Sequence, residues 1–315
     1  MEGLVVKTTG SNVRVRTGNG DFYDCRIRGK LRMKGIRSTN PVAVGDRVLF
    51  DLEPGTERGV IHEIAERKNY IVRRSVNLSK ETHILAANLD QALLVVTLAF
   101  PKTLLGFIDR FLVTAEAYDI PAILIFNKVD LYGEEEKEEL EYLELVYRNA
   151  GYQTLRTSAT QGDGLEALKD LLKDRTSLIS GHSGVGKSTL INQIAPGLDL
   201  KTAEISETHQ QGQHTTTFAE MFFLPFGGQI IDTPGIRGFG LVRMEKEEIG
   251  HYFPEIFSLS KQCRFHNCLH LQEPGCAVIE AVENHRLAPT RYQSYFNMIN
   301  GLDDENPYRQ DIYAN

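Results

Sequence analysis

The chain has 315 residues, which is enough for two or three domains with hydrophobic cores of their own. Its composition is that of an ordinary globular protein, and its longest apolar run, residues 92–100, is too short to cross a bilayer. The first residues, Met1-Glu2-Gly3, open no signal peptide, so we expect a cytoplasmic protein with no membrane association.

Charge is distributed unevenly along the chain. The formal net charge of −7 argues by itself against general nucleic-acid binding. Residues 1–74, however, carry 15 Lys and Arg against 9 Asp and Glu, whereas the remaining residues carry 20 against 33. A basic N-terminal part followed by an acidic body predicts a localised anionic partner.

Residues 3–66 have the pattern of five short strands separated by glycine-containing turns, which predicts a small barrel of the OB type. The expected strands are residues 4–8, 13–17, 22–28, 47–52 and 60–64. Alternation along two of them places Val13, Val15, Tyr23, Cys25 and Ile27 inside and Arg14, Arg16, Arg26 and Arg28 outside. A basic loop follows, with Lys30, Arg32, Lys34 and Arg37. This arrangement predicts an RNA-binding barrel, with the alternative that the arginines only solvate a half-buried sheet.

Residues 70–88 are expected to be a polar connector. From residue 89 onward, strands and helices alternate, which is typical of a doubly wound α/β sheet. We expect strands at residues 92–98, 122–126, 154–156, 177–180 and 229–231, and helices at residues 104–118, 134–149 and 165–173.

A phosphate-binding loop follows the strand at residues 177–180. It reads Gly181-His182-Ser183-Gly184-Val185-Gly186-Lys187-Ser188-Thr189 and opens a helix. The glycines let the backbone N–H groups curl around a polyphosphate, Lys187 would reach the β and γ phosphates, and the Ser188 hydroxyl would bind Mg²⁺. The alternative is a glycine-rich turn with a chance Lys-Ser pair.

Asn127-Lys128-Val129-Asp130 follows another predicted buried strand. The Asp130 carboxylate can accept hydrogen bonds from guanine N1–H and the 2-amino group, which adenine does not offer. Asn127 would tie this segment to the phosphate loop, the Lys128 stem would cover the ring, and a backbone N–H of Ser158 or Ala159 would contact guanine O6. On its own the tetrapeptide could be a capped turn, but beside a phosphate loop it predicts guanine recognition.

Two segments after the phosphate loop predict a nucleotide switch. Residues 212–217, Gly-Gln-His-Thr-Thr-Thr, offer threonines, Thr216 among them, that could close over Mg²⁺. In Asp232-Thr233-Pro234-Gly235, the Asp232 carboxylate can hold a Mg²⁺-bound water and the Gly235 N–H can sense the γ-phosphate. The base-recognising segments come before the phosphate loop instead of after the switch, so we predict a circularly permuted GTPase.

The predicted catalytic residues are Lys187, Ser188, Asp232, Gly235, His214 and Thr216. Ras-like enzymes carry a water-orienting Gln directly after the switch glycine, and here that position is Ile236. We therefore expect slow intrinsic hydrolysis. His214 is the nearest polar candidate for positioning the water, with the alternative that it hydrogen-bonds only its own loop.

Three of the four cysteines fall within 14 residues in the pattern Cys263-x4-Cys268-x-His270-x5-Cys276. Three thiolates and one imidazole are a tetrahedral set suited to Zn²⁺, and a site filled entirely by protein should be structural. His266 could replace His270, and free cysteines are the remaining alternative. Helical patterns at residues 245–258 and 277–286 would pack around the metal.

The permuted order, with a barrel ahead of it and a Cys/His cluster behind, resembles the RsgA (YjeQ) family of bacterial GTPases, which depend on the small ribosomal subunit. The resemblance covers nearly the whole chain. It implies GTP hydrolysis stimulated by the 30S subunit, contact with 16S rRNA and a role in late maturation of that subunit. One departure is that Gln213 stands where the family usually has Arg before the switch histidine, so the contacts of that Arg are not expected here.

We therefore expect a multidomain protein with four segments: an N-terminal all-β OB-type barrel at 1–70, a linker at 71–88, a circularly permuted α/β P-loop GTPase domain at 89–240 and a helical zinc-binding module at 241–315. It would bind one structural Zn²⁺ and bind Mg²⁺ together with GTP, and it would act as a monomer. The rival prediction is a P-loop kinase that phosphorylates a small molecule, which the Asn-Lys-x-Asp and Asp-Thr-Pro-Gly segments oppose. A third is a GTP-dependent metal chaperone with an exchangeable zinc site.

Overall fold

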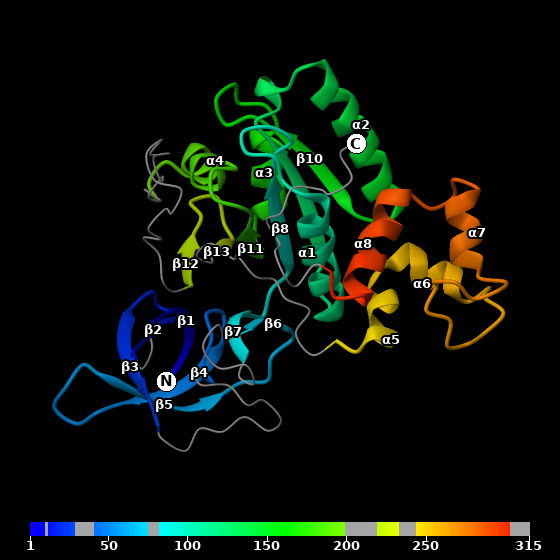
Figure 1. Cartoon of the computed structure of the whole chain (residues 1–315). Coiled ribbons are helices and arrows are strands. Elements are labelled where there is room, and N and C mark those ends of the chain that lie inside the picture. The colour runs from blue at the N-terminus through cyan, green and yellow to red at the C-terminus, as the bar shows by residue number, and fades with distance from the viewer. Residues whose placement is uncertain (10–11, 29–40, 75–81, 199–218, 233–243, 303–315) are drawn as a thin grey trace.

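The computed structural model describes residues 1–9, 12–28, 41–74, 82–198, 219–232 and 244–302. A β-barrel, an α/β domain and a group of C-terminal helices follow one another along the chain (Figure 1). None of the helices within these ranges combines the length and the apolar character that a membrane span requires.

Five N-terminal strands close into a barrel. They are β1 (Glu2–Thr9), β2 (Asn12–Thr17), β3 (Phe22–Ile27), β4 (Arg47–Leu52) and β5 (Gly59–Ile64). Strand β1 pairs antiparallel with both β2 and β4, β3 lies parallel to β5, and β4 pairs with β5, so the sheet returns on itself. The predicted OB-type barrel is confirmed, and each predicted strand overlaps an observed one.

Alternate residues of these strands fill the barrel. The side chains that are at most 2% exposed in its core are Val5, Val13, Val15, Cys25, Val42, Val48, Phe50 and Ile61. Tyr23 and Ile27 pack at the edge of this core. A Cβ on Gly59 would lie 2.4 Å from Cys25 Sγ, so β5 can approach β3 this closely only because residue 59 is glycine.

Residues 70–74 and 82–87 form a small second sheet, so the expectation of a polar connector at 70–88 was wrong for the described part of this segment. Strands β6 (Tyr70–Arg74) and β7 (Thr82–Ala87) pair antiparallel. Ile71 and Ala86 are fully buried and join the core of the α/β domain. Charged and polar residues between the two strands dominated the sequence pattern, whereas the short apolar stretches beside them determine the structure.

The α/β domain contains a sheet with the strand order β10-β9-β8-β11-β13-β12. Its strands are β8 (Gln91–Val96), β9 (Ala122–Asn127), β10 (Gln153–Thr157), β11 (Thr176–Ser180), β12 (Glu220–Phe223) and β13 (Gln229–Asp232). Its helices are α1 (Leu105–Ala117), η1 (Val129–Leu131), α2 (Glu134–Asn149), α3 (Leu165–Leu172) and α4 (Lys187–Ile194). All neighbouring strands are parallel except β12, which the sequence pattern did not predict.

Helices cover both faces of this sheet, as a doubly wound fold requires. On one face, Leu94 and Phe126 pack with residues of α1 and α2. On the other face, Leu93 and Ile125 pack with residues of α3 and α4. Consecutive residues of β8 therefore serve opposite cores, which explains why this strand reads as a continuous apolar run.

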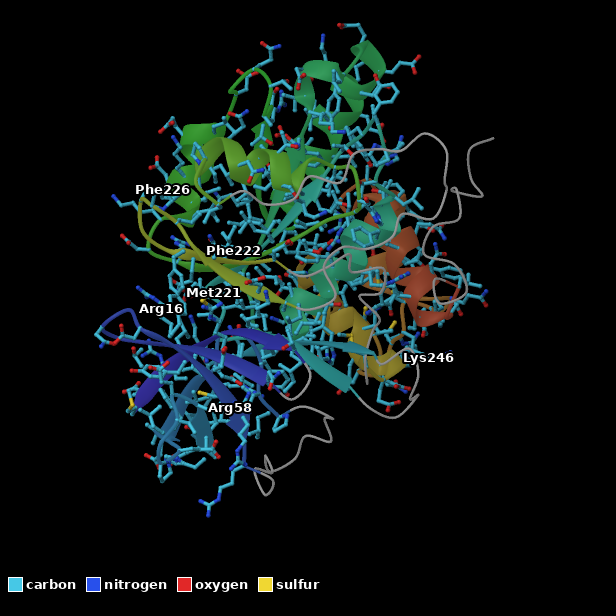
Figure 2. The ribbon with its side chains drawn as sticks, turned by 90° about the vertical axis from the view of Figure 1, so that its left-hand side faces the viewer. Arg16, Arg58, Met221, Phe222, Phe226 and Lys246 are labelled. Carbon is cyan, nitrogen blue, oxygen red and sulfur yellow. The ribbon has the colours of Figure 1, made fainter. Side chains whose placement is uncertain are left out.

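Strand β12 connects the barrel to the α/β domain. It pairs antiparallel with β13 on one side and with β1 on the other, where Lys7 lies opposite Glu220. The Lys7 Nζ and Glu220 Oε2 atoms are 2.8 Å apart. Figure 2 shows Arg16 of the barrel directly beneath the strand that carries Met221 and Phe222. Both parts thus share one eleven-stranded sheet.

The C-terminal helices pack against α1 (Figure 1). They are α5 (Lys246–Ile249), η2 (Gly250–Tyr252), α6 (Pro254–Ser260), α7 (Ala277–Glu283) and α8 (Pro289–Ile299). The single helix expected at residues 245–258 is broken because Pro254 has no N–H and starts a new helix instead. The helix expected at 277–286 is α7, and α8 was not predicted.

Candidate nucleotide and metal sites

The phosphate loop connects the end of β11 to the start of α4. Gly181, Gly184 and Gly186 adopt φ angles of +144°, +84° and +93°. A Cβ on Gly181 would lie 2.3 Å from Val95 O, and one on Gly186 would lie 2.5 Å from Asn127 Nδ2. Since neither position has room for a side chain, these glycines are required by the loop path and not only by its flexibility.

Lys187 points back into this loop. Its Nζ donates to the carbonyl oxygens of Gly181 at 2.7 Å and His182 at 2.6 Å. Burial lowers the pKa of Lys187 to about 8, and the Asp232 carboxylate at the end of β13 acts in the opposite direction. Burial in turn raises the pKa of Asp232. A cation placed this way among carbonyl groups is suited to an anionic ligand that fills the loop.

The ring of His182 lies over Phe107 of α1, with a centroid distance of 3.8 Å. Burial and the neighbouring Lys187 lower the pKa of His182 to about 4, so the imidazole is neutral near pH 7. Of the other predicted loop residues, Val185 is buried, Ser188 is half-buried, and Ser183 and Thr189 are exposed.

Asn127 joins the predicted base-recognition segment to the phosphate loop. Its Nδ2 donates to Val185 O at 2.8 Å, and its Oδ1 accepts from Thr157 Oγ1 at 3.0 Å. The Lys128 backbone adopts a left-handed conformation, with φ +62°, and its Nζ donates to Phe100 O at 2.6 Å. The structure therefore brings together two segments that lie more than 50 residues apart in the chain.

Asp130 and the segment containing Ser158 and Ala159 also lie together. The exposed Asp130 carboxylate accepts a hydrogen bond from Thr160, and hydrogen bonding by the Ser158 and Thr160 hydroxyls lowers the pKa of Asp130. The Ser158 N–H donates to Asp163 O at 3.0 Å. Of the two predicted N–H donors to guanine O6, Ala159 is therefore the better candidate. Val129, the remaining residue of the tetrapeptide, packs against the sheet core.

Tyr132 belongs to this site, although no motif in the sequence marks it. Its hydroxyl accepts from the Leu98 N–H at 2.9 Å and donates to Asn127 O at 2.8 Å. It thereby fixes the ends of β8 and β9 relative to each other. The predicted switch residues His214, Thr216 and Gly235 lie outside the described residues.

The outward arginines of the barrel divide into three groups. Arg14 and Arg28 are exposed, as expected. Arg26 is also exposed, but its Nε donates to Glu53 Oε1 at 2.8 Å. Arg16 is half-buried, with its guanidinium 4.3 Å from the centre of the Phe223 ring, so it supports the contact with β12 instead of facing solvent alone. The predicted basic loop residues Lys30, Arg32, Lys34 and Arg37 lie outside the described ranges.

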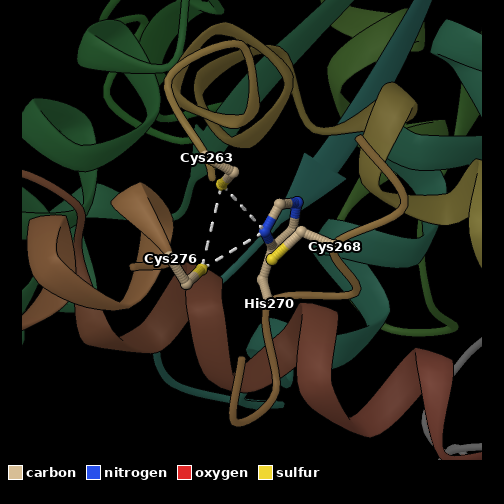
Figure 3. Close-up of side chains that lie close together, drawn as sticks. All are labelled: Cys263, Cys268, His270 and Cys276. Atoms are coloured by element: carbon tan, nitrogen blue, oxygen red, sulfur yellow. Dashed lines mark hydrogen bonds between the residues drawn. The ribbon is translucent and has the colours of Figure 1, made fainter. Parts of the chain in front are cut away.

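Cys263, Cys268, His270 and Cys276 gather at one point among the C-terminal helices (Figure 3). Their candidate ligand atoms all lie within 4.8 Å of one another. The Nδ1 atom of His270 is 3.6 Å from Cys263 Sγ and 3.4 Å from Cys276 Sγ, and the two sulfur atoms are 4.0 Å apart. Zinc–sulfur bonds of about 2.3 Å at tetrahedral angles place sulfur atoms roughly 3.8 Å apart, so this group could hold a zinc ion. His266 is exposed and is not part of the group.

Neighbouring side chains hold the loop of this cluster in place. The Glu273 carboxylate accepts from the Leu269 and Leu271 N–H groups, each at 2.8 Å. Tyr292 OH and Tyr295 OH on α8 donate to His270 O and Leu269 O, each at 2.7 Å. These supporting residues were not predicted. The Glu-Pro-Gly at residues 273–275 could have suggested a carboxylate folded back on its own turn, but nothing in the sequence pairs α8 with this loop.

Family models identify the two larger parts of the chain. The RsgA GTPase model matches residues 64–242, and the RsgA N-terminal domain model matches residues 2–61. A "Small ribosomal subunit biogenesis GTPase RsgA" from Christiangramia forsetii is 59% identical over 315 residues, covering 99% of both chains. A protein of the same name from Bacteroides fragilis is 57% identical over 310 residues, covering 98% of this chain and 99% of the relative.

Two solved structures also match this chain over nearly its whole length. The chain matches YjeQ from Thermotoga maritima with a TM-score of 0.77 and 37% identity, covering 98% of this chain and 99% of that one. It matches YloQ, described as a circularly permuted GTPase, with a TM-score of 0.72 and 32% identity, covering 98% and 96% of the two chains. The base-recognition segment at the end of β9 precedes the phosphate loop that follows β11, which is the permuted order. This chain therefore belongs to the RsgA family of circularly permuted GTPases.

Proposed function

We propose that this GTPase acts in biogenesis of the small ribosomal subunit, binding the 30S particle and hydrolysing GTP to GDP and phosphate during its late maturation. The observation that carries the proposal is the end-to-end match with relatives that are named for this role. The match with the RsgA GTPase model also favours a GTPase over the small-molecule kinase. The contact between the Asn127 side chain and the phosphate loop favours it as well.

Guanine nucleotide would bind between the phosphate loop and the segments at 127–130 and 157–160. Asp130 would accept from N1–H and the 2-amino group, and the Ala159 N–H would donate to O6. Lys187, which already points into the loop, would move its ammonium from carbonyl oxygens to the β and γ phosphates. The proposed nucleotide-binding residues are Asn127, Lys128, Val129, Asp130, Ser158, Ala159 and the loop from Gly181 to Thr189.

Mg²⁺ bound with GTP would neutralise charge on the phosphates, and Ser188 and Asp232 are the residues that would hold it, the latter through water. The Gly235 N–H would sense the γ-phosphate, Thr216 would close the switch, and His214 would position the attacking water. Ile236 supplies no polar group where Ras-like enzymes have Gln. Intrinsic hydrolysis should therefore be slow and should rise when the 30S subunit completes the site.

Zn²⁺ is the metal that fits the group of three cysteines and one histidine. The tyrosine hydroxyls and the Glu273 carboxylate that fix the surrounding loop support a structural ion. The same contacts argue against a metal chaperone, which needs an exchangeable site. We propose that the bound ion joins α6, α7 and α8 into one unit.

The barrel would contact 16S rRNA through Arg14, Arg26, Arg28 and the basic loop that follows, and the protein would act in the cytoplasm as a monomer. We retain the proposed division into a barrel at 1–70, a linker at 71–88, a GTPase domain at 89–240 and a zinc-binding module at 241–315. In the segment at 71–88, strands β6 and β7 pair with each other, and their Ile71 and Ala86 side chains pack in the core of the GTPase domain.

Co-sedimentation with purified 30S subunits tests the proposed partner. Binding should be tighter with a non-hydrolysable GTP analogue than with GDP, because only the former orders a switch through its γ-phosphate. Asp130→Asn should bind xanthosine diphosphate in preference to GDP, since the amide turns one acceptor into a donor. Absence of 30S binding in both nucleotide states would contradict the proposed role.

A further inference from the structure

The segment from Thr157 to Thr160 contacts both ends of the base-recognition tetrapeptide. Thr157 Oγ1 donates to Asn127 Oδ1 at 3.0 Å, and Thr160 Oγ1 donates to Asp130 Oδ2 at 2.9 Å. The two acceptors differ in environment, since Asn127 is 1% exposed and Asp130 lies at the surface. Packing fixes the asparagine, whereas the aspartate needs a hydrogen bond to fix its orientation.

The hydrogen bond between Thr160 and Asp130 has a defined direction. An ionised carboxylate only accepts, so the single Thr160 hydroxyl proton is used on Asp130. The Ser158 hydroxyl lies 3.1 Å from the Thr160 hydroxyl, and hydrogen bonding by Ser158 also lowers the pKa of Asp130. The Ser158 oxygen in turn accepts from the Gln161 N–H at 3.1 Å. The Thr160 and Ser158 hydroxyls thus both favour the ionised Asp130 carboxylate, and the Gln161 N–H in turn holds the Ser158 oxygen in place.

A hydrogen bond to one oxygen restricts the orientations that the Asp130 carboxylate can adopt. The terminal torsion of an aspartate is broad, so an exposed carboxylate without a partner samples many orientations. It has about four acceptor positions, of which Thr160 occupies one. The remaining positions can then meet two donors side by side, as on the N1 and 2-amino edge of guanine.

We propose that Thr160 is a specificity-determining positioning residue, whose hydroxyl orients the Asp130 carboxylate toward the N1–H and 2-amino groups of guanine. The inference rests on the guanine-nucleotide binding proposed above and deepens it. Thr160 itself touches no part of the nucleotide in this scheme. It acts through Asp130, so its removal should affect the choice of base more than the binding of phosphates.

Affinities of the full-length protein for GDP and for inosine diphosphate test this, because inosine lacks only the 2-amino group. Thr160→Val keeps the shape and removes the hydroxyl, so the preference for GDP over inosine diphosphate should fall by about fivefold. Thr160→Ser restores a hydroxyl and should restore the preference. Thr154→Val on β10 is the matched control, since it removes a hydroxyl that accepts from the Arg148 Nε of α2, away from the base.

Three results would overturn the inference. The first is an unchanged preference in Thr160→Val when the wild type is guanine-selective, which leaves the proposed function intact. The second is an equal loss of affinity for GDP and inosine diphosphate, which would mean general damage to the loop. The third is equal affinity of the wild type for GDP and ADP, and only this result would also contradict the proposed guanine binding. Equal melting temperatures for Thr160→Val and Thr154→Val would exclude unfolding as the cause of a lost preference.

Discussion

The guanidinium Nη1 of Arg291 on α8 lies 2.6 Å from the Oδ1 of Asp109 on α1, and both side chains are 1% exposed. The Nε of Arg291 also donates to Glu255 Oε1 on α6 at 2.6 Å. One buried cation therefore joins two helices of the metal-binding part to a helix of the GTPase domain. That same helix carries Phe107, which lies against His182 of the phosphate loop. The two sites are thus connected through α1.

Loss of this cation should strongly destabilise the folded protein. Arg291→Met leaves Asp109 buried without its partner, which typically costs about 3–5 kcal/mol in free energy of unfolding. The double variant Asp109→Asn, Arg291→Met should recover part of that loss, because no unpaired charge remains buried on α1. Urea unfolding followed by circular dichroism measures both. Arg286→Met is the control, since the Arg286 ion pair with Glu280 is about half exposed and should matter little. Equal unfolding free energies for Arg291→Met and Arg286→Met would contradict the structural role of Arg291.

Nucleotide affinity should depend on pH through Lys187. Burial lowers its folded-state pKa from 10.5 to about 8, so above that pH the free protein loses the positive charge that a polyphosphate needs. The affinity for GDP should therefore fall as pH rises from about 8 to 10. Over the same range the folding penalty for burying Lys187 should shrink, because the lysine is then neutral in the folded protein. Titration calorimetry between pH 7 and pH 9.5 in buffers of different ionisation enthalpy should show proton uptake on binding. Lys187→Met should bind more weakly and lack this proton uptake. A wild-type affinity that does not change with pH would contradict the depressed pKa.

Zinc should stabilise the C-terminal helices and leave the GTPase core folded. Chelation or Cys268→Ser removes an ion that contributes roughly 10 kcal/mol or more in zinc-finger peptides. Hydrogen exchange should rise in α6, α7 and α8, while β8 to β11 stay protected. Cys25→Ser is the control, because Cys25 lies in the barrel core far from the cluster in the chain and should leave exchange in these helices unchanged. Elemental analysis of the native protein that finds no stoichiometric zinc would contradict the assignment.

Binding to 30S should weaken steeply with salt because of the barrel arginines. Each rRNA phosphate neutralised by Lys or Arg contributes somewhat less than one unit to the slope of log affinity against log salt. Arg14→Gln with Arg28→Gln should therefore lower that slope by about one to two units. The control is Lys137→Gln with Lys169→Gln, which removes the same charge from α2 and α3. If the two double variants give the same slope, the barrel is not the RNA-binding face.

The sequence predicted most where chemistry and periodicity agree. Glycines 181 and 186 were assigned to a phosphate loop from their spacing, and the backbone has no room for a side chain at either position. The three cysteines and His270 were grouped by metal-like spacing, and the fold brings their ligand atoms together. The alternation of Val13, Arg14 and Val15 likewise gave the inner and outer faces of a barrel strand correctly.

The parts that were missed depend on contacts between segments distant in the chain. Strand β12 is four residues long, and its place is set by β1 and β13 on either side. Arg291 is a charged residue on a helix and would ordinarily be placed at the surface, but Asp109 and Glu255 receive it in the interior. Tyr132 and Thr160 act on Asn127 and Asp130 through single hydrogen bonds, which leave no periodic pattern.

Steady-state GTP hydrolysis with and without purified 30S subunits tests the proposed function most directly. The chain offers Ile236 in place of a water-orienting Gln, so turnover should be slow alone and should rise at least about tenfold with 30S, which corresponds to about 1.4 kcal/mol off the barrier. Lys187→Ala should abolish the increase by weakening nucleotide binding, and 50S subunits should not reproduce it. Equal turnover in the presence and absence of 30S subunits would contradict a GTPase that works on the small ribosomal subunit.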